Sequence, residues 1–396
     1  MDSPRGRIYQ MVQVANGAPI TPAYTQHIGL CLACRGCESA CPSGVRYGRM
    51  VEDARAEIET WRSAHAPRTH TARSLRHFVF HRLLQSRGLL TFAGALLYLY
   101  EASGVKALVR GMGRMKLLGP LGDLGQLAPS ADPPFFFNQI GRTFPAQSEQ
   151  RYRVAFLAGC IANVCFARLN EATVRVLQKN GCEVVVPEGQ GCCGALHVHS
   201  GLREEAQRLA RRNIDAIETA GFDAIITNAA GCGSTLKEYA ELLEDDPQYA
   251  AKAHAFAAKM RDVTEFLAGI ELNPRMGPLN LTVTYQDACH LAHGQRIRSA
   301  PRKLLAAVPG LKFREMAGSD LCCGSAGIYN VVENEMSMQI LARKMEAVKA
   351  TGTEVIAAVN PGCMLQLETG VRLHGSKQRV MHVVELLDLA YKQSQK

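Results

Sequence analysis

Cysteine residues carry the strongest chemical signal in this sequence. Fourteen occur among its 396 residues, and eight of them form two sets of four, each containing the adjacent pair of a Cys-Cys-Gly motif. Corresponding members of the two sets lie 129, 130, 130 and 131 residues apart, which indicates an internal repeat. The first set is Cys160, Cys192, Cys193 and Cys232, and the second set is Cys289, Cys322, Cys323 and Cys363.

Three kinds of chemistry are open to these eight thiols. Thiolates near helix N-termini are stabilised as anions, so they suit metal ligation or redox chemistry. The alternatives are iron–sulfur clusters in one or both halves, a redox disulfide such as Cys160–Cys192, and buried structural cysteines. The repeated frame favours clusters, because structural cysteines would not need a shared spacing. Cys165 and Cys182 have no counterpart in the second half, and we expect them to be packing residues.

A second cysteine motif lies near the start of the chain. Its residues are Cys31, Cys34, Cys37 and Cys41, followed by Pro42. This spacing is typical of bacterial ferredoxins and predicts a 4Fe-4S cluster, with a zinc site as the alternative. We expect Gly36 and Ala40 to let the loop curl around the cluster.

The fourth cysteine of this motif has two interpretations. In two-cluster ferredoxins it ligates the other cluster, whose own motif should lie upstream. Residues 1–30 contain no cysteine. Either Cys41 completes the cluster locally, or the polypeptide lacks an N-terminal segment that carries the sister motif.

Charge and composition indicate the cellular compartment and the partners of the protein. The chain opens without an apolar leader, which favours thiols in a reducing cytoplasm over a disulfide framework. The net charge is +9, and from Arg62 to Lys116 there are ten Lys or Arg against one acid, Glu101. This basic region is either a solvated face or a docking site for an acidic partner or the inner face of the cytoplasmic membrane. No nucleic-acid recognition motif accompanies the charge, so we expect no nucleic-acid partner.

The pattern of apolar residues predicts the elements that position the cysteines. Helical periodicity dominates residues 50–125, where the apolar run Leu89–Tyr100 would rise about 18 Å as a helix, too short to span a bilayer. A Pro/Gly-rich linker follows over 118–150, and its PPFFFN segment is expected to pack across a domain. From Arg151 onward, short β-branched runs alternate with helices, which predicts parallel sheets with crossover helices. Each repeated cysteine follows a strand, so each set should converge at one sheet edge.

We therefore predict a mixed α+β and α/β fold in which a small helical ferredoxin-type domain precedes two tandem α/β domains. Their parallel sheets should be related by a pseudo-two-fold axis. The predicted boundaries are 1–60 for the ferredoxin-type domain, incomplete at its N-terminus, 61–150 for the basic helical region and linker, 151–275 for the first cysteine-rich domain and 276–396 for the second.

The combination of motifs resembles a known family. The two Cys-Cys-Gly frames are similar to the CCG domains of heterodisulfide reductase, and the order of all regions resembles the iron–sulfur subunit of bacterial glycolate oxidase. The strings that carry this resemblance are Ser3–Tyr9 (SPRGRIY), Cys34–Gly48 (CRGCESACPSGVRYG), Gly191–His199 (GCCGALHVH) and Leu321–Gly327 (LCCGSAG). The resemblance covers essentially the whole chain. The sequence departs from the broader CCG pattern at Thr235 and Gln366, where that pattern has a fifth cysteine in each half.

The resemblance implies an electron-transfer subunit of a flavin-dependent 2-hydroxy-acid dehydrogenase. Its partners would be FAD-containing subunits that oxidise glycolate to glyoxylate, with electrons passing toward quinone. No catalytic residue is expected in this chain, since no dinucleotide fingerprint follows a strand. The alternatives are a related subunit acting on lactate, glycerol 3-phosphate or a heterodisulfide, or a zinc-binding scaffold without redox function.

Overall fold

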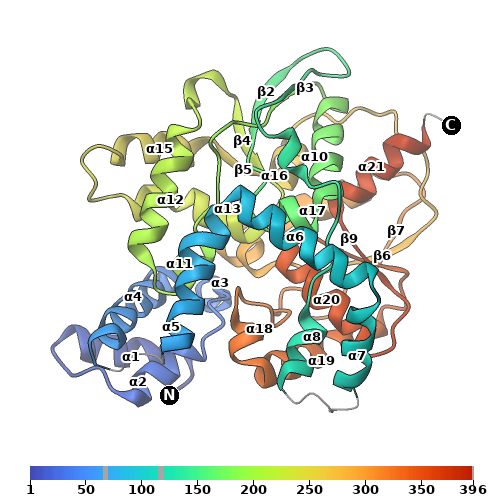
Figure 1. Ribbon diagram of the computed structural model, residues 1–396. Coiled ribbons are helices and arrows are strands. Elements are labelled where there is room, and N and C mark those ends of the chain that lie inside the picture. The colour runs from blue at the N-terminus through green and yellow to red at the C-terminus, as the bar shows by residue number, and fades with distance from the viewer. Residues whose placement is uncertain (66–69, 115–119, 395–396) are drawn as a thin grey trace.

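The computed structural model describes residues 1–65, 70–114 and 120–394. The chain is a mixed α/β protein, mostly helical, with two separate sheets (Figure 1). A helical N-terminal segment comes first, a run of helices then follows one side of the molecule, and the two sheets form the rest.

Four helices make the N-terminal segment: α1 (Pro4–Ala15), α2 (Pro22–Gly29), α3 (Gly36–Ala40) and α4 (Tyr47–His65). Ser3 and Thr21 cap α1 and α2 through their hydroxyl groups, and each is followed by a proline, which suits the first position of a helix. Ile28 and Val51 lie in the small core of this segment, which also includes Cys31. The first cysteine of the ferredoxin-type motif is therefore anchored in a core of its own.

The next helices cover the outside of the molecule. They are α5 (His70–His77), a π turn over Phe78–Arg82, a 3₁₀ turn over Leu83–Gln85, α6 (Arg87–Ala102), α7 (Val105–Arg114) and α8 (Pro120–Leu127). Helices were predicted here, and the structure confirms them. The predicted packing of the linker is also confirmed, because Phe136 is buried against Phe156 in an edge-to-face contact with ring centroids 6.0 Å apart.

The first sheet has the order β1-β3-β2-β4-β5. Its strands are β1 (Thr143–Phe144), β2 (Tyr152–Phe156), β3 (Cys182–Val185), β4 (Ala224–Thr227) and β5 (Met260–Asp262). Its helices are α9 (Ala162–Cys165), α10 (Ala167–Lys179), α11 (Ala195–His199), α12 (Arg203–Asp215), α13 (Ala230–Lys237), α14 (Tyr239–Leu242), α15 (Ala250–Lys259) and α16 (Val263–Gly269). The expectation of a purely parallel sheet is wrong here, since β1 pairs antiparallel with β3. β1 belongs to the linker and reaches the sheet edge without a crossover helix, which parallel pairing would require.

The second sheet is parallel throughout, with the order β7-β6-β8-β9. Its strands are β6 (Thr282–Tyr285), β7 (Lys312–Phe313), β8 (Val355–Ala358) and β9 (Arg379–His382). A π turn over His290–Gly294 and helices α17 (Ser299–Ala307), α18 (Tyr329–Val332), α19 (Asn334–Ala350), α20 (Pro361–Leu373) and α21 (Val383–Gln393) complete it. The parallel strands of the first sheet follow the same order, so the sequence repeat corresponds to a repeat of topology.

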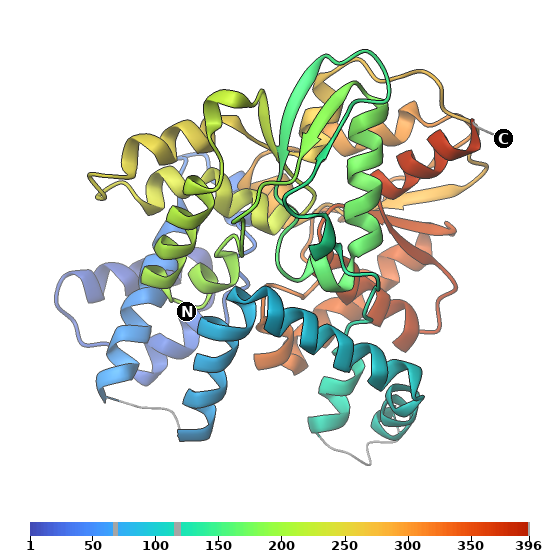
Figure 2. The ribbon, with the colours of Figure 1, turned by 45° about the horizontal axis from the view of Figure 1, so that its top comes forward.

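The two halves share a hydrophobic core. Buried residues of both, from Val154 to Tyr391, form one contiguous cluster. Helix α10 packs against α21, as Figure 2 shows for the green and red helices beside the first sheet. Arg175 on α10 binds Asp388 on α21 in a two-pronged ion pair of 2.9 and 2.8 Å. The predicted domain boundaries and the pseudo-two-fold axis stay predictions.

A matched capping device follows the last strand of each half. Asp262, the last residue of β5, and His382, the last residue of β9, each accept a backbone hydrogen bond at the start of a helix, and Glu265 and Glu385 accept from the amide of the cap residue. The ring of His382 also contacts the carbonyl of Asn228 in the first half at 3.1 Å. This histidine therefore joins the two halves as well as capping α21.

His382 predicts a specific acid sensitivity. Burial lowers its pKa from 6.5 to about 4, so the folded protein binds fewer protons than the unfolded chain between these values. The contribution of the neutral ring to the free energy of unfolding is fully present above pH 6.5 and is lost as the pH falls toward 4. At about 1.4 kcal/mol per pKa unit, the effect is on the order of 3 kcal/mol. The variant His382→Asn keeps a capping acceptor and cannot be protonated.

The free energy of unfolding, measured in denaturant at several pH values, should therefore fall more steeply in the wild type than in His382→Asn between pH 6.5 and 4. Parallel curves for the two proteins would show that His382 is not responsible for acid sensitivity.

Candidate metal centre

All eight repeated cysteines line one cavity of about 330 Å³. Each set reaches it from loops and helix starts that follow the strands of its own sheet, as predicted. Leu32 and Ala33 from the ferredoxin-type motif form part of the wall. Three segments that are distant in the sequence therefore meet at this cavity.

The four thiols of the first set are in contact with one another. The sulfurs of Cys160 and Cys192 are 3.6 Å apart, Cys192 is hydrogen-bonded to Cys193, and Cys193 is hydrogen-bonded to Cys232. The hydrogen bond with Cys192, together with burial, raises the pKa of Cys160 well above its ordinary value. Four thiolates could not coexist here without a cation to balance them, which is the condition a metal centre satisfies.

The second set repeats this arrangement. Cys289 is hydrogen-bonded to Cys322, Cys322 to Cys323, and Cys323 to Cys363. The amide of Gly324 donates to the Cys322 sulfur at 3.4 Å, and Asn360 Nδ2 donates to the Cys363 sulfur at 3.4 Å. Donors of this kind stabilise sulfur that carries negative charge.

The glycine of each Cys-Cys-Gly motif is required by its backbone. Gly194 and Gly324 have φ angles of +85° and +94°, in the left-handed region that favours glycine. A Cβ on Gly324 would also lie 2.7 Å from the carbonyl oxygen of Ser337. The tight turn that places the cysteine pair therefore depends on this residue type.

The two positions that lack a fifth cysteine are buried. Gln366 donates to Ser337 Oγ at 3.0 Å and accepts from Asn330 Nδ2 at 3.0 Å. Thr235 lies on α13, one turn after Cys232. Each half therefore presents four thiols to the cavity.

The ferredoxin-type loop brings three of its four cysteines together. Cys31 and Cys34 both act electrostatically on Cys37, and burial is the largest cause that raises the pKa of Cys37 to about 11. The curl of the loop comes from Ala33 and Arg35, with φ angles of +50° and +61°. The left-handed conformation therefore falls on Ala33 and Arg35, whereas Gly36 begins α3 and its amide donates to the Cys34 thiol.

Cys41 stands at the C-terminal end of α3. Its thiol accepts hydrogen bonds from the backbone amides of Val45, Ser43 and Gly44, which lower its pKa. The structure thus presents Cys41 to a different set of partners. Whether Cys41 completes the local cluster stays a prediction.

The second half holds the ferredoxin-type loop through histidines. His290, next to Cys289, contacts the Ala33 carbonyl at 3.1 Å, and His293 contacts Ser39 Oγ at 2.9 Å. Cys289 also contributes to the raised pKa of Cys34, after burial, so the two thiols lie close together. The loop and the second cysteine set are therefore direct neighbours.

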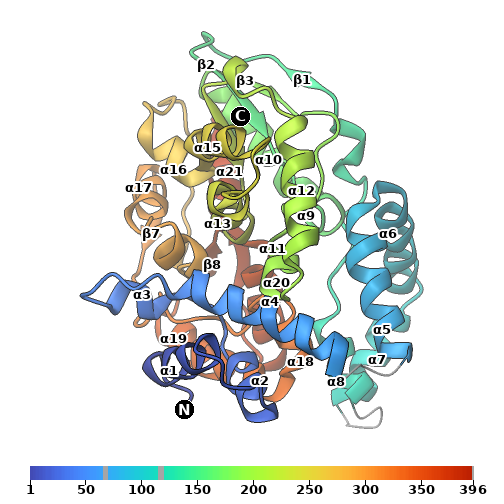
Figure 3. The same cartoon turned by 90° about the vertical axis from the view of Figure 1, so that its left-hand side faces the viewer.

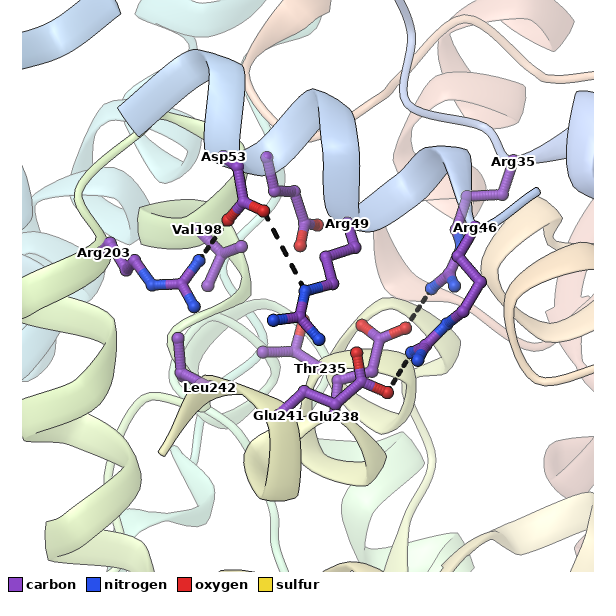
Figure 4. Close-up of a pocket in the computed structure, with 11 residues that line it drawn as sticks. Arg35, Arg46, Arg49, Asp53, Val198, Arg203, Thr235, Glu238, Glu241 and Leu242 are labelled. Atoms are coloured by element: carbon purple, nitrogen blue, oxygen red, sulfur yellow. Dashed lines mark hydrogen bonds and ion pairs between the residues drawn. The ribbon is translucent and has the colours of Figure 1, made fainter. Parts of the chain in front are cut away.

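The first half holds the same loop through ion pairs. Arg35 pairs with Glu38 in its own loop and with Glu238, and Arg46 pairs with Glu241. Figure 4 shows these arginines directed from the N-terminal segment toward the carboxylates below them. Burial of this interface raises the pKa of Glu238 to about 7, although the nearby charge of Arg35 opposes that rise. The loop is thereby fixed between both halves.

Sequence reasoning missed three residues at this junction. Arg55 donates to the Cys31 carbonyl at 2.5 Å and to the His199 carbonyl at 3.0 Å. The His199 ring lies edge-to-face with His290, with centroids 4.9 Å apart, and contacts Glu52 at 3.2 Å. Glu52 and Arg55 lie within an amphipathic helix whose pattern shows only that one face is buried, so no local signal marked them.

The donor chemistry fits iron–sulfur clusters. All fourteen cysteines are free thiols, including Cys160 and Cys192. Cys165 and Cys182 do not line the cavity, and Cys182 is buried in the core as the first residue of β3, as expected for packing residues. Over residues 1–65, 70–114 and 120–394, no group of three or more His, Cys, Asp or Glu is arranged to hold a single metal ion. The fit rests on thiol donors gathered with amide donors in a buried site.

Comparisons with known proteins agree with this chemistry. The model of the cysteine-rich CCG domain matches residues 154–237 and 283–368, and the model of the glycolate oxidase iron–sulfur subunit linker region matches residues 71–128. The chain is 41% identical over 394 residues to the probable glycolate oxidase iron–sulfur subunit of Bacillus subtilis, covering 97% of this chain and 87% of that protein. It is 30% identical to the glycolate oxidase iron–sulfur subunit of Escherichia coli, covering 98% and 88%. The lactate utilization protein A of Bacillus subtilis is 31% identical over 60% of this chain and 99% of its own length.

Proposed function

Since this chain belongs to the family of glycolate oxidase iron–sulfur subunits, we propose that it carries electrons from FAD-containing partner subunits toward quinone while those partners oxidise glycolate to glyoxylate. The observation that supports this role is the meeting of eight thiols from two repeats with the ferredoxin-type loop at one cavity. Electron transfer through a protein requires redox centres held close together and away from water, and this arrangement provides such positions.

The ferredoxin-type loop would hold a 4Fe-4S cluster with Cys31, Cys34 and Cys37, and with Cys41 as the fourth predicted ligand. Such a cluster accepts and donates single electrons when bound. The chain's own residues prepare its site: Ala33 N donates to the Cys31 sulfur at 3.4 Å, and the Tyr47 hydroxyl donates to the same sulfur at 3.5 Å. Hydrogen bonds to ligand sulfur are a main determinant of cluster potential.

The two CCG sets would hold further clusters, each with four thiolates. The glycine amide of each Cys-Cys-Gly turn donates to a sulfur of its own set, and two cysteines of each set are buried. No residue of this chain is proposed to abstract hydride or a proton from the substrate. That chemistry belongs to the flavin-containing partners.

A second substrate has support from one observation. The similarity to the lactate utilization protein A spans almost the whole of that relative, whose name refers to lactate. Glycolate is favoured because the two glycolate oxidase relatives match nearly the whole of this chain. We further propose that the complex lies in the cytoplasm, at the inner face of the membrane that contains its quinone.

The proposed function is tested in the assembled complex. Mixing the anaerobic complex with glycolate should bleach the visible absorbance of this subunit, because reduction of iron–sulfur clusters weakens their charge-transfer bands. Lactate at the same concentration is the matched control and should act more slowly. Bleaching by lactate alone would assign the chain to the other substrate, and bleaching by neither would contradict the proposal.

A further inference from the structure

Helix α6 presents an apolar face to the outside of the molecule. Its inner face is set by Gly94, where a Cβ would come within 2.6 Å of Val164 and 2.7 Å of Phe135. On the opposite face Phe92, Leu96 and Leu99 are 62%, 51% and 61% exposed. A helix of a soluble protein ordinarily directs polar residues outward, whereas the outward face of α6 is apolar.

The apolar surface extends onto the neighbouring helices. Leu108 on α7 is 61% exposed, Val105 is also exposed, and Leu75 and Phe78 are exposed on and beside α5. Figure 3 shows α5, α6 and α7 along the same outer side, with the C-terminal end of α4 beside α5. Contiguous exposed apolar surface of this kind marks an interaction site.

The charges around this surface are positive. Arg73 and Arg82 are exposed and Arg87 is half-buried, and the three lie along the segment from α5 to the first residue of α6. The thirteen residues between Arg87 and Glu101 carry no charge. Glu101 is paired with Lys106 at 3.1 Å, so its charge is balanced within the molecule.

The lengths of α6 and α7 bear on whether either helix alone could span a membrane. Among the described helices no single one is long and apolar enough to cross a membrane, and α6 and α7 pass such a test only as a pair bent by 73°. A bent pair with one apolar side and a cationic margin matches helices that lie within a membrane interface. The basic margin is complementary to anionic headgroups, which favours a lipid surface over a protein partner.

We propose that the outer face of α6 and α7 docks on an anionic bilayer surface, with Phe92, Leu96 and Leu99 entering the acyl boundary and the arginines binding headgroup phosphates. This face lies apart from the cysteine-lined cavity, so the inference does not depend on the clusters. Docking would hold the subunit beside the membrane phase in which quinone is dissolved.

Vesicle flotation of the full, anaerobically prepared chain tests the proposal. Vesicles of phosphatidylcholine with 30 mol% phosphatidylglycerol should carry the wild-type protein, and pure phosphatidylcholine vesicles should carry little of it. The variant L96D/L99D should lose at least about tenfold in partitioning, because charged groups are expelled from the acyl boundary. The variant R73Q/R82Q should lose about fivefold for each arginine and most of its salt dependence.

The control is Val12→Asp, which places one carboxylate at an exposed apolar position on α1. It should float as the wild type does, and circular dichroism should show equal folding of all variants. Failure of the wild-type protein to float with anionic vesicles would overturn the proposal. Flotation that L96D/L99D leaves unchanged would do the same, as would loss of FAD-subunit binding in L96D/L99D without any vesicle binding.

Discussion

Replacing Cys34 with serine should reduce glycolate-dependent quinone reduction by the complex more than about 100-fold, since even outer hydrogen-bond partners of metal ligands contribute about 10–100-fold. Cys34 lies at the centre of the ferredoxin-type loop, between Cys31 and Cys37 and close to Cys289. The flavin partners should keep their flavin and still reduce an artificial dye. The measurement is the ratio of quinone-linked to dye-linked turnover.

The control for this variant is Cys165→Ser, which removes a partly buried thiol that does not line the cavity. Its ratio of the two activities should equal that of the wild type. Retained quinone-linked turnover in Cys34→Ser would show that electrons do not pass through the ferredoxin-type loop.

Replacing one cysteine of each CCG pair should remove iron in separate steps. Cys193→Ser and Cys323→Ser each break the hydrogen-bonded series of four thiols in one half. Each single variant should lose the iron of one cluster, and the double variant should lose the iron of two while the ferredoxin-type cluster remains. The measurement is iron per chain in each purified protein, with Cys165→Ser again as the control.

Unchanged iron in both single variants would assign the repeated cysteines to a structural or disulfide role. Loss of iron in only one of the two single variants would mean that both halves keep the arrangement of the four thiols but only one half binds a cluster. The amount of iron lost from each variant therefore distinguishes the alternatives that the sequence left open.

The position of the repeated cysteines could be predicted because it depends on local order along the chain. An apolar run such as VAFLAG over residues 154–159 predicts a strand, and a cysteine after a parallel strand must reach the sheet edge. The same reasoning placed Cys289 correctly. That both sets share one cavity could not be predicted, because it depends on how α10 packs against α21.

Other features depend on contacts that the sequence does not encode locally. The antiparallel strand β1 is only two residues long and belongs to the linker, so no alternation marked it. The left-handed conformation of Ala33 and Arg35 is maintained by the loop's contacts with His290 and Glu238. Residue type alone would have assigned that conformation to Gly36.

The capping repeat does have a signal in the sequence. Asp262 and His382 stand at the same place in two similar strings, RDVTEF and MHVVEL, each with glutamate three residues after the cap. The offset of 120 residues differs from that of the cysteines, so the capping strings do not share the spacing of the cysteine repeat. The functional junction at Arg55 and His199 had no such pattern.

Iron and acid-labile sulfide, counted per chain in an anaerobic preparation, test the central claim most directly. The account predicts a brown protein with broad visible absorbance, a reducible electron paramagnetic resonance signal, and iron and sulfide in equal amounts. A colourless protein that contains neither element, or one that contains zinc in their place, would contradict it.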